Sequence, residues 1–147
     1  MTIEQTSRIL VVANETVDGA VVHAATRGRR AVEVLVIAPA LNSRLRHWLS
    51  DEDEARRDAE RRLGTCLERL RAADVDAIGR VGDADPLLAI DDSLRLFPAD
   101  EIVIATRPDT RPHGRRRNLV GRARSRYRQP ILHVVVDPAG GQEYVAA

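Results

Sequence analysis

The chain has 147 residues, of which 44% are hydrophobic and 31% charged, a composition typical of one globular domain. All its basic residues are arginine, and the absence of lysine excludes a Walker-type phosphate loop, a Schiff-base enzyme and a phospho-receiver domain. A net charge of +1, a single cysteine and the lack of a long apolar run argue against a dedicated nucleic-acid protein, an internal disulfide and a membrane span. We therefore expect a cytoplasmic protein.

In the first third of the chain, apolar runs alternate with helical patterns. Arg8–Ala13 predicts a buried strand, and Val17–Arg27 predicts the helix that follows it. Ala31–Ala38 predicts a second strand, and Leu41–Leu49 a short amphipathic connector.

The middle of the chain predicts a long helix and a half-exposed strand. The helix begins at Ser50 or Asp51, with acids in the first turn, where the helix dipole favours them. Val75–Val81 follows as a strand whose charges suit a sheet edge. The apolar stripe of the helix is Ala55, Ala59, Leu63, Cys66, Leu67 and Leu70, which assigns Cys66 to packing.

The last third predicts two helices and two strands. Asp85 caps a helix that begins at proline, and Glu101–Ala105 is the fourth strand. Asn118 is predicted to cap the next helix, and Pro130–Val136 is the fifth strand. Residues 137–147 look like a loose tail.

Five strands alternating with four helices predict a three-layer α/β/α sandwich with a parallel sheet. We expect a single domain over residues 1–147, with its core at about 8–136. Ligands of such sheets bind beyond the carboxyl ends of the strands, where the strand order reverses. That rule directs attention to residues 14–16 and 106–118.

Three stretches of the chain resemble a known family. They are RILVVANET, VGDADPLLAIDDSLRLFPADEIVIAT and RQPILHVVVD. Together they resemble a universal stress protein (UspA-like) domain, within the adenine-nucleotide alpha-hydrolase-like group. The resemblance implies the strand order 3-2-1-4-5 with two helices on each face. It also implies a homodimer through Ile131–Val136, an apolar strand that this order places at a sheet edge.

The resemblance further implies a site for ATP or AMP. An aspartate follows the first strand in the nucleotide-binding branch, and this chain has Asn14 there. The base lies against backbone at the end of the second strand, which corresponds to Ile37. The glycines of the phosphate motif fall on Ala105, Pro108 and Arg117, followed by Asn118 in place of serine or threonine. The implied site is Ala13, Asn14, Ile37, Ala105, Thr106, Arg107, Arg117, Asn118 and Leu119.

Loss of these glycines changes the chemistry of the implied site. Glycines let backbone amides approach phosphate closely, and Pro108 also removes one amide donor. The amide end of a helix near Asn118 still favours an anion, and the nearby arginines can donate charge-assisted hydrogen bonds. The segment therefore looks like a degenerate phosphate cradle.

Two other interpretations of residues 107–117 stay open, a solvated basic loop and a nucleic-acid surface. Aromatic residues make up 3% of the chain, and those near the arginines are Tyr127 and His113, which disfavours base stacking. The four histidines are scattered without metal-ligand spacing, so no metal is expected.

No nucleophile and base pair in the sequence, so no catalytic residue is assigned. We expect a non-catalytic regulatory or stress-response module with weak or no nucleotide binding and an unidentified protein partner. The alternatives are an ATP- or AMP-binding switch or slow nucleotide hydrolase, and a polyanion or RNA binder through residues 107–128.

Overall fold

The computed structural model describes residues 6–14, 22, 32–40, 52–107, 115–137 and 141–145, with the backbone alone at 52, 115–118, 137 and 141–145. The strands are β1 (Ser7–Ala13), β2 (Val32–Pro39), β3 (Ala77–Gly82), β4 (Glu101–Thr106), β5 (Ile131–Asp137) and β6 (Gly141–Val145). The helices are α2 (Glu52–Ala72), α3 (Pro86–Leu96) and α4 (Arg115–Arg126). The predicted helix at 17–27 and connector at 41–49 lie outside the described residues, except Val22, which is helical and buried.

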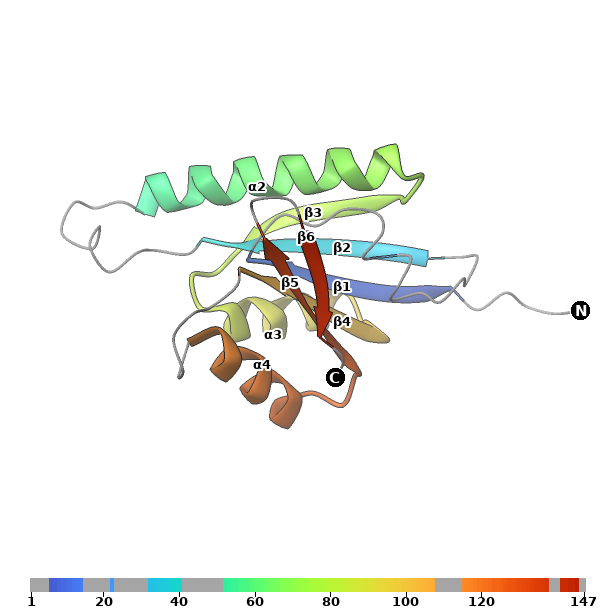
Figure 1. Cartoon of the computed structure of the whole chain (residues 1–147), viewed down its shortest axis with the longest axis vertical. Helices are drawn as coiled ribbons and strands as arrows, with labels where there is room; N and C mark the ends of the chain where they lie inside the picture. Colours follow the sequence, from blue (N-terminus) through green and yellow to red (C-terminus); the bar gives the residue numbers. More distant parts are fainter. Residues whose placement is uncertain are drawn as a thin grey trace, which may run out of the picture.

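The strands form one sheet in the order β3-β2-β1-β4-β5-β6 (Figure 1). Strands β1 to β5 are all parallel, which confirms the predicted α/β fold and the order 3-2-1-4-5. The order reverses between β1 and β4, because the chain builds outward from β1 through β2 and β3 and then returns to β4.

The prediction of a loose tail is wrong for Gly141–Val145. This segment is β6, which pairs antiparallel with β5 and brings Val145 into register with His133. An apolar strand with one unpaired edge leaves backbone donors and acceptors unsatisfied, and β6 satisfies them on β5. Strand β5 is therefore not the edge of the sheet, and a homodimer through Ile131–Val136 stays a prediction that requires β6 to move aside.

The sheet separates two hydrophobic cores. Alternate residues of each strand point to opposite faces, so Val11 of β1 packs on the α2 side and Val12 packs on the α3 and α4 side. Val22 joins the core on the α2 side. Both faces of β1 and β4 are buried, as expected for central parallel strands.

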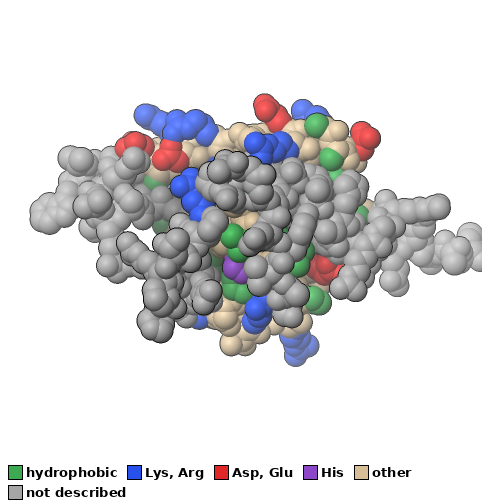
Figure 2. All heavy atoms as spheres, in the orientation of Figure 1, with side chains coloured by type: hydrophobic (Ala, Val, Ile, Leu, Met, Phe, Trp, Pro, Cys, Tyr) green, Lys and Arg blue, Asp and Glu red, His purple; other side chains and the backbone are tan. Residues whose placement is uncertain are grey.

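Helix α2 covers its face of the sheet through the predicted stripe. Ala59, Cys66 and Leu70 have no exposed surface, which confirms that Cys66 packs in the core. The opposite surface of α2 carries mixed acidic and basic side chains (Figure 2). The acids of this helix therefore belong to a solvated face.

The two helices on the other face differ in how well the sequence predicts their starts. The Asp85 carboxylate accepts a hydrogen bond from the backbone nitrogen of Leu87 at 3.0 Å, which confirms the predicted cap of α3. Helix α4 begins at Arg115, so Asn118 lies inside the helix and the prediction that it caps the helix is wrong. Arginine is a good helix former, so the arginines before Asn118 extend the helix toward its amino end.

A polar cluster fastens α3 to α4. The Arg126 guanidinium donates from Nε and Nη2 to the two carboxylate oxygens of Asp91, at 3.0 and 2.5 Å. The Tyr127 hydroxyl contacts Asp91 Oδ1 at 2.7 Å and the carbonyl oxygen of Leu87 at 3.1 Å. The bond from Arg126 holds the pKa of Asp91 below its usual range, and burial raises the pKa of Tyr127. Tyr127 is thereby fixed between the helices, which does not suit it to stack on a nucleic-acid base.

Close packing of α3 on the sheet predicts a strong effect of Gly82→Ala. A Cβ atom at Gly82 would lie 2.9 Å from Ala89 Cβ on α3, closer than real side chains approach. We expect Gly82→Ala to lower the free energy of unfolding by about 1–3 kcal/mol, measured by urea denaturation.

Gly64→Ala is the matched control, because Gly64 is on the exposed surface of α2 and a Cβ there would meet nothing within 4 Å. Helix propensity predicts a gain of roughly 0.8–1.0 kcal/mol for this variant. Equal effects of the two substitutions would contradict the packing argument.

Candidate functional site

The site expected in this fold lies at the carboxyl edge of the sheet, between β1 and β4. Ala13 and Ala105 are register partners there, so the residues that follow them, Asn14 and Thr106, come next along adjacent strands. Both continue the face that carries Val12 and Ile104, which is the face covered by α3 and α4. The fold thus brings together two predicted site residues that are far apart in the sequence.

Thr106 is hydrogen-bonded to a histidine that the sequence analysis did not place at the site. Its Oγ1 lies 2.7 Å from Nε2 of His133 on β5, and the two residues are 1% and 9% exposed. Burial lowers the pKa of His133, and the positive charge of Arg124 on α4 lowers it further. Folding therefore disfavours the charged form of the ring.

Thr106 and His133 are a hydroxyl and a base in contact, the combination that activates a nucleophile in many hydrolases. Among the described residues, no carboxylate is hydrogen-bonded to the ring to orient it, and Thr106 has almost no exposed surface. An attacking hydroxyl must reach its substrate. The hydrogen bond satisfies two buried polar groups at the end of the sheet.

Asn14 carries an open hydrogen-bond acceptor. Its Oδ1 is buried, and no donor among the described residues lies within hydrogen-bond distance of it. An unsatisfied buried acceptor costs about 1–3 kcal/mol. This acceptor is therefore a polar group that the described part of the chain does not satisfy.

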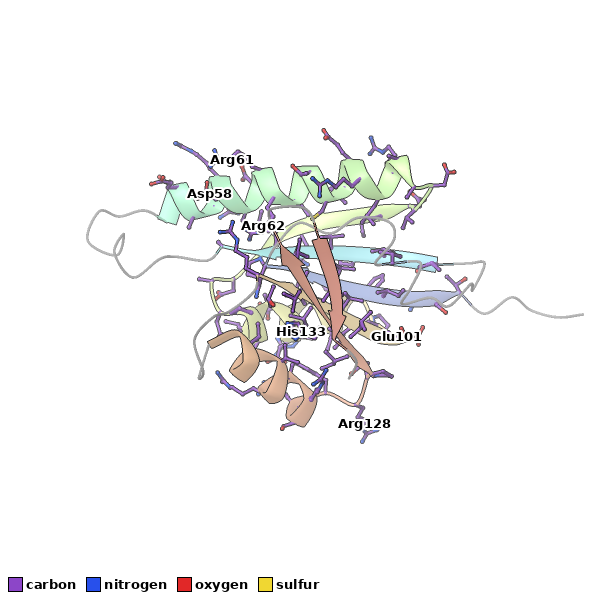
Figure 3. The ribbon with its side chains drawn as sticks, in the orientation of Figure 1. Asp58, Arg61, Arg62, Glu101, Arg128 and His133 are labelled. Atoms are coloured by element: carbon purple, nitrogen blue, oxygen red, sulfur yellow. The ribbon has the colours of Figure 1, made fainter. Side chains whose placement is uncertain are left out.

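The side chain of Arg62, on α2, is hydrogen-bonded to the carboxyl ends of two strands. It donates from Nε to the carbonyl oxygen of Ala13 and from Nη2 to that of Pro39, both at 2.6 Å. Figure 3 shows its side chain reaching from α2 toward the sheet. The guanidinium thus bridges the last carbonyls of β1 and β2 and brings a positive charge to the edge where a ligand would bind.

The sequence analysis missed Arg62, although a signal for it exists. It lies among several arginines of a charged helix and looks solvated when only its neighbours are read. By spacing, however, Ala59, Arg62 and Cys66 are three and four residues apart, which places the arginine on the buried stripe. A charged residue on the buried face of a helix indicates that a specific polar group inside the protein pairs with it.

The other predicted site residues lie in varied environments. Ile37 is buried and has register partners in both β1 and β3. Because β2 continues for two more residues, to Pro39, Ile37 does not lie at the end of this strand. Arg107 is exposed, and Leu119 is half-buried against the core on the α3 and α4 side. Arg117 and Asn118 belong to α4, with side chains outside the description, and Pro108 lies among the residues that are not described.

Two further observations apply to the described part of the chain. No group of three His, Cys, Asp or Glu side chains there gathers as a metal site would require. None of its helices is both long and apolar enough to cross a membrane.

Comparison of the chain with models of known protein families found no match, and comparison with curated proteins found none either.

The role of Arg62 predicts that its loss destabilises the fold. Arg62→Ala removes two hydrogen bonds from a charged donor, and such bonds contribute about 1.5–3 kcal/mol each. Since Arg62 is half-buried, we expect a loss of at least about 1.5 kcal/mol in urea denaturation. The control is Arg61→Ala, because Arg61 is exposed and pairs with Asp58 on the same helix. That variant should stay within about 0.5 kcal/mol of the parent protein, and an equal loss in both would contradict the bridging role.

The buried histidine predicts a pH dependence of stability. The pKa of His133 in the folded state lies below its ordinary value of 6.5, so the unfolded chain takes up the proton first as the pH falls. The contribution of the buried His133 to the free energy of unfolding is therefore fully present above pH 6.5. It decreases as the pH falls through 6.5 toward the pKa of the folded state.

His133→Gln removes the titrating group, so the difference in unfolding free energy between parent and variant should shrink between about pH 8 and about pH 5. Urea denaturation at a series of pH values measures this difference. A constant difference would show that His133 does not carry the effect.

Proposed function

We propose that this chain is a non-catalytic regulatory or stress-response module of the universal-stress-protein type, with weak or no nucleotide binding. The parallel order 3-2-1-4-5 is the one that the resemblance implies. The observation that carries the proposal is the pair of 2.6 Å hydrogen bonds from Arg62 to the carbonyls of Ala13 and Pro39.

These bonds bear directly on recognition of a base. In the implied binding mode, the base lies against the backbone at the end of the second strand. The amino group of adenine needs a carbonyl acceptor there, and Arg62 uses the last carbonyl of β2, that of Pro39. A base entering this place must displace a charged donor from two acceptors, which weakens binding.

The burial of the hydroxyl and base that are in contact among the described residues supports a non-catalytic role. The hydroxyl and base that meet at this edge, Thr106 and His133, are both buried. These two side chains thus stabilise the edge instead of presenting reactive groups. A module of this kind acts through a partner, and the described residues do not identify one.

One observation favours the alternative of an ATP- or AMP-binding switch. The buried Oδ1 of Asn14 lacks a donor within the described chain, at the position where the resemblance implies a ligand contact. If Arg62 moves, the carbonyls of Ala13 and Pro39 that it binds become available beside Asn14. Nucleotide binding would then depend on the position of one side chain.

Isothermal calorimetry with ATP, AMP and a short RNA separates these functions. For the parent protein we expect no saturable binding of any of them up to about 1 mM, a limit that corresponds to about 4 kcal/mol of binding energy. Arg62→Ala should bind ATP more tightly than the parent, whereas Arg61→Ala should not.

Other outcomes would replace the proposal. Saturable binding of ATP by the parent protein in the presence of magnesium would favour the switch or slow hydrolase. RNA binding that weakens steeply with salt would favour the polyanion binder. If Arg62→Ala binds no better than Arg61→Ala, the bridging arginine is not what closes the site.

A further inference from the structure

The sheet ends at β3 on one side and at β6 on the other (Figure 1). In the described part of the chain, β3 pairs with β2 alone, in register from Ala77 to Gly82. One row of its backbone groups therefore faces outward. Such a row is a template for pairing with another strand.

Three exposed side chains line this edge, and we call them the β3 edge triplet: Asp76, Ile78 and Arg80. Ile78 and Arg80 are in register with Leu35 and Ile37, which pack in the core on the α3 and α4 side. Strand alternation places Asp76, just before β3, on the same face. Ile78 is 66% exposed, so no helix covers the sheet at this position.

The opposite face of β3 is already occupied. A Cβ atom at Gly79 would lie 2.5 Å from Leu63 Cδ1, which shows how closely α2 packs on the strand. Any partner of β3 must therefore meet it along its open edge and on the face of the triplet. Asp76 and Arg80 are both exposed, and neither takes part in the salt bridges found among the described residues, so both charges can face that partner.

We propose that this edge pairs with β3 of a second copy of the chain, antiparallel and centred on Ile78. A two-fold axis through this position brings Ile78 opposite Ile78 of the other copy. It also places Asp76 opposite the other copy's Arg80, and Arg80 opposite its Asp76. The triplet is thus complementary to itself, as an isologous interface requires.

The order of charges also selects the direction of pairing. A parallel, in-register pair would place arginine opposite arginine and aspartate opposite aspartate, and like charges facing each other across strands are destabilising. The antiparallel pair joins opposite charges and buries the exposed isoleucine against itself. Charges at a sheet edge commonly prevent pairing. An acidic and a basic residue placed symmetrically about Ile78 nevertheless permit the antiparallel pair, because each faces a residue of opposite charge.

Disulfide trapping tests both the pairing and its register. Facing Cα atoms in an antiparallel pair are about 4.5–5.5 Å apart, within the range that a disulfide spans. Ile78→Cys should therefore form a disulfide-linked dimer under mild oxidation. Arg80→Cys is the matched control, since position 80 faces position 76 of the other copy and the two substituted positions lie roughly 14 Å apart.

Each result of this experiment is decisive. Rapid cross-linking at position 78 with little at position 80 supports the proposal. Equal cross-linking at both positions indicates random collision or a parallel pair, and no cross-linking at position 78 indicates that this edge is not an interface. Either of the last two results overturns the proposal. The native thiol of Cys66 does not interfere, because it is fully buried.

A charge exchange measured by analytical ultracentrifugation gives an independent test. Asp76→Arg and Arg80→Asp each place like charges opposite each other, so each should raise the dimer dissociation constant by roughly tenfold or more. The double variant restores opposite charges and should regain the affinity of the parent protein. Circular dichroism of the variants checks that these exposed substitutions leave the fold intact. Two results overturn the proposal: a parent protein that is monomeric at micromolar concentration, or a dimer dissociation constant that neither single substitution changes.

Discussion

The structure depends on burying both faces of the two central strands, β1 and β4. Each presents apolar side chains to both sides of the sheet, so helices must cover both sides before these strands leave water. Burial of a large aliphatic side chain contributes about 1.5–3 kcal/mol, and the largest fully buried side chains include Ile9, Leu10 and Ile104 on these strands. Helices α2, α3 and α4 are placed by this requirement, and their contacts with the sheet follow from it.

The same constraint creates the polar edge. Parallel strands end together, so their last carbonyls and the first polar side chains beyond them collect in one place. In this protein the molecule supplies its own partners for several of these groups. Arg62 bridges the carbonyls of Ala13 and Pro39, and Thr106 pairs with His133. Asn14 Oδ1 is the acceptor left without a donor among the described residues. These contacts satisfy, within the described chain, several of the polar groups that the fold collects at this edge.

A sheet whose central strands are covered on both faces can associate through its ends. At one end β6 covers β5 and removes the edge that the order of the parallel strands would have exposed. At the other end, within the described part of the chain, β3 pairs with β2 alone and carries an exposed isoleucine and two exposed charges of opposite sign. The two ends are thus unequal, and self-association through β3 would extend the sheet without disturbing the carboxyl edge. Binding at that edge and dimerisation through β3 are physically separable in this arrangement.

Local patterns in the sequence determined much of this protein. Apolar runs located four of the five parallel strands, and an alternating pattern located the half-exposed β3. Three- and four-residue spacing located the buried stripe of α2, because burial of one helix face follows a local period. The cap at Asp85 was equally local. The contact between Thr106 and His133 was decided by tertiary structure, because it joins two strands that are separated in the chain by α4. Arg62 shows the boundary most clearly. The spacing of Arg62 on α2 could be recognised in the sequence. Its hydrogen-bond partners, the carbonyls of Ala13 and Pro39, could not, because they lie next to each other only in the folded sheet. Hydrogen bonding needs a defined distance and direction between two groups, and for groups far apart in sequence only the folded chain supplies both.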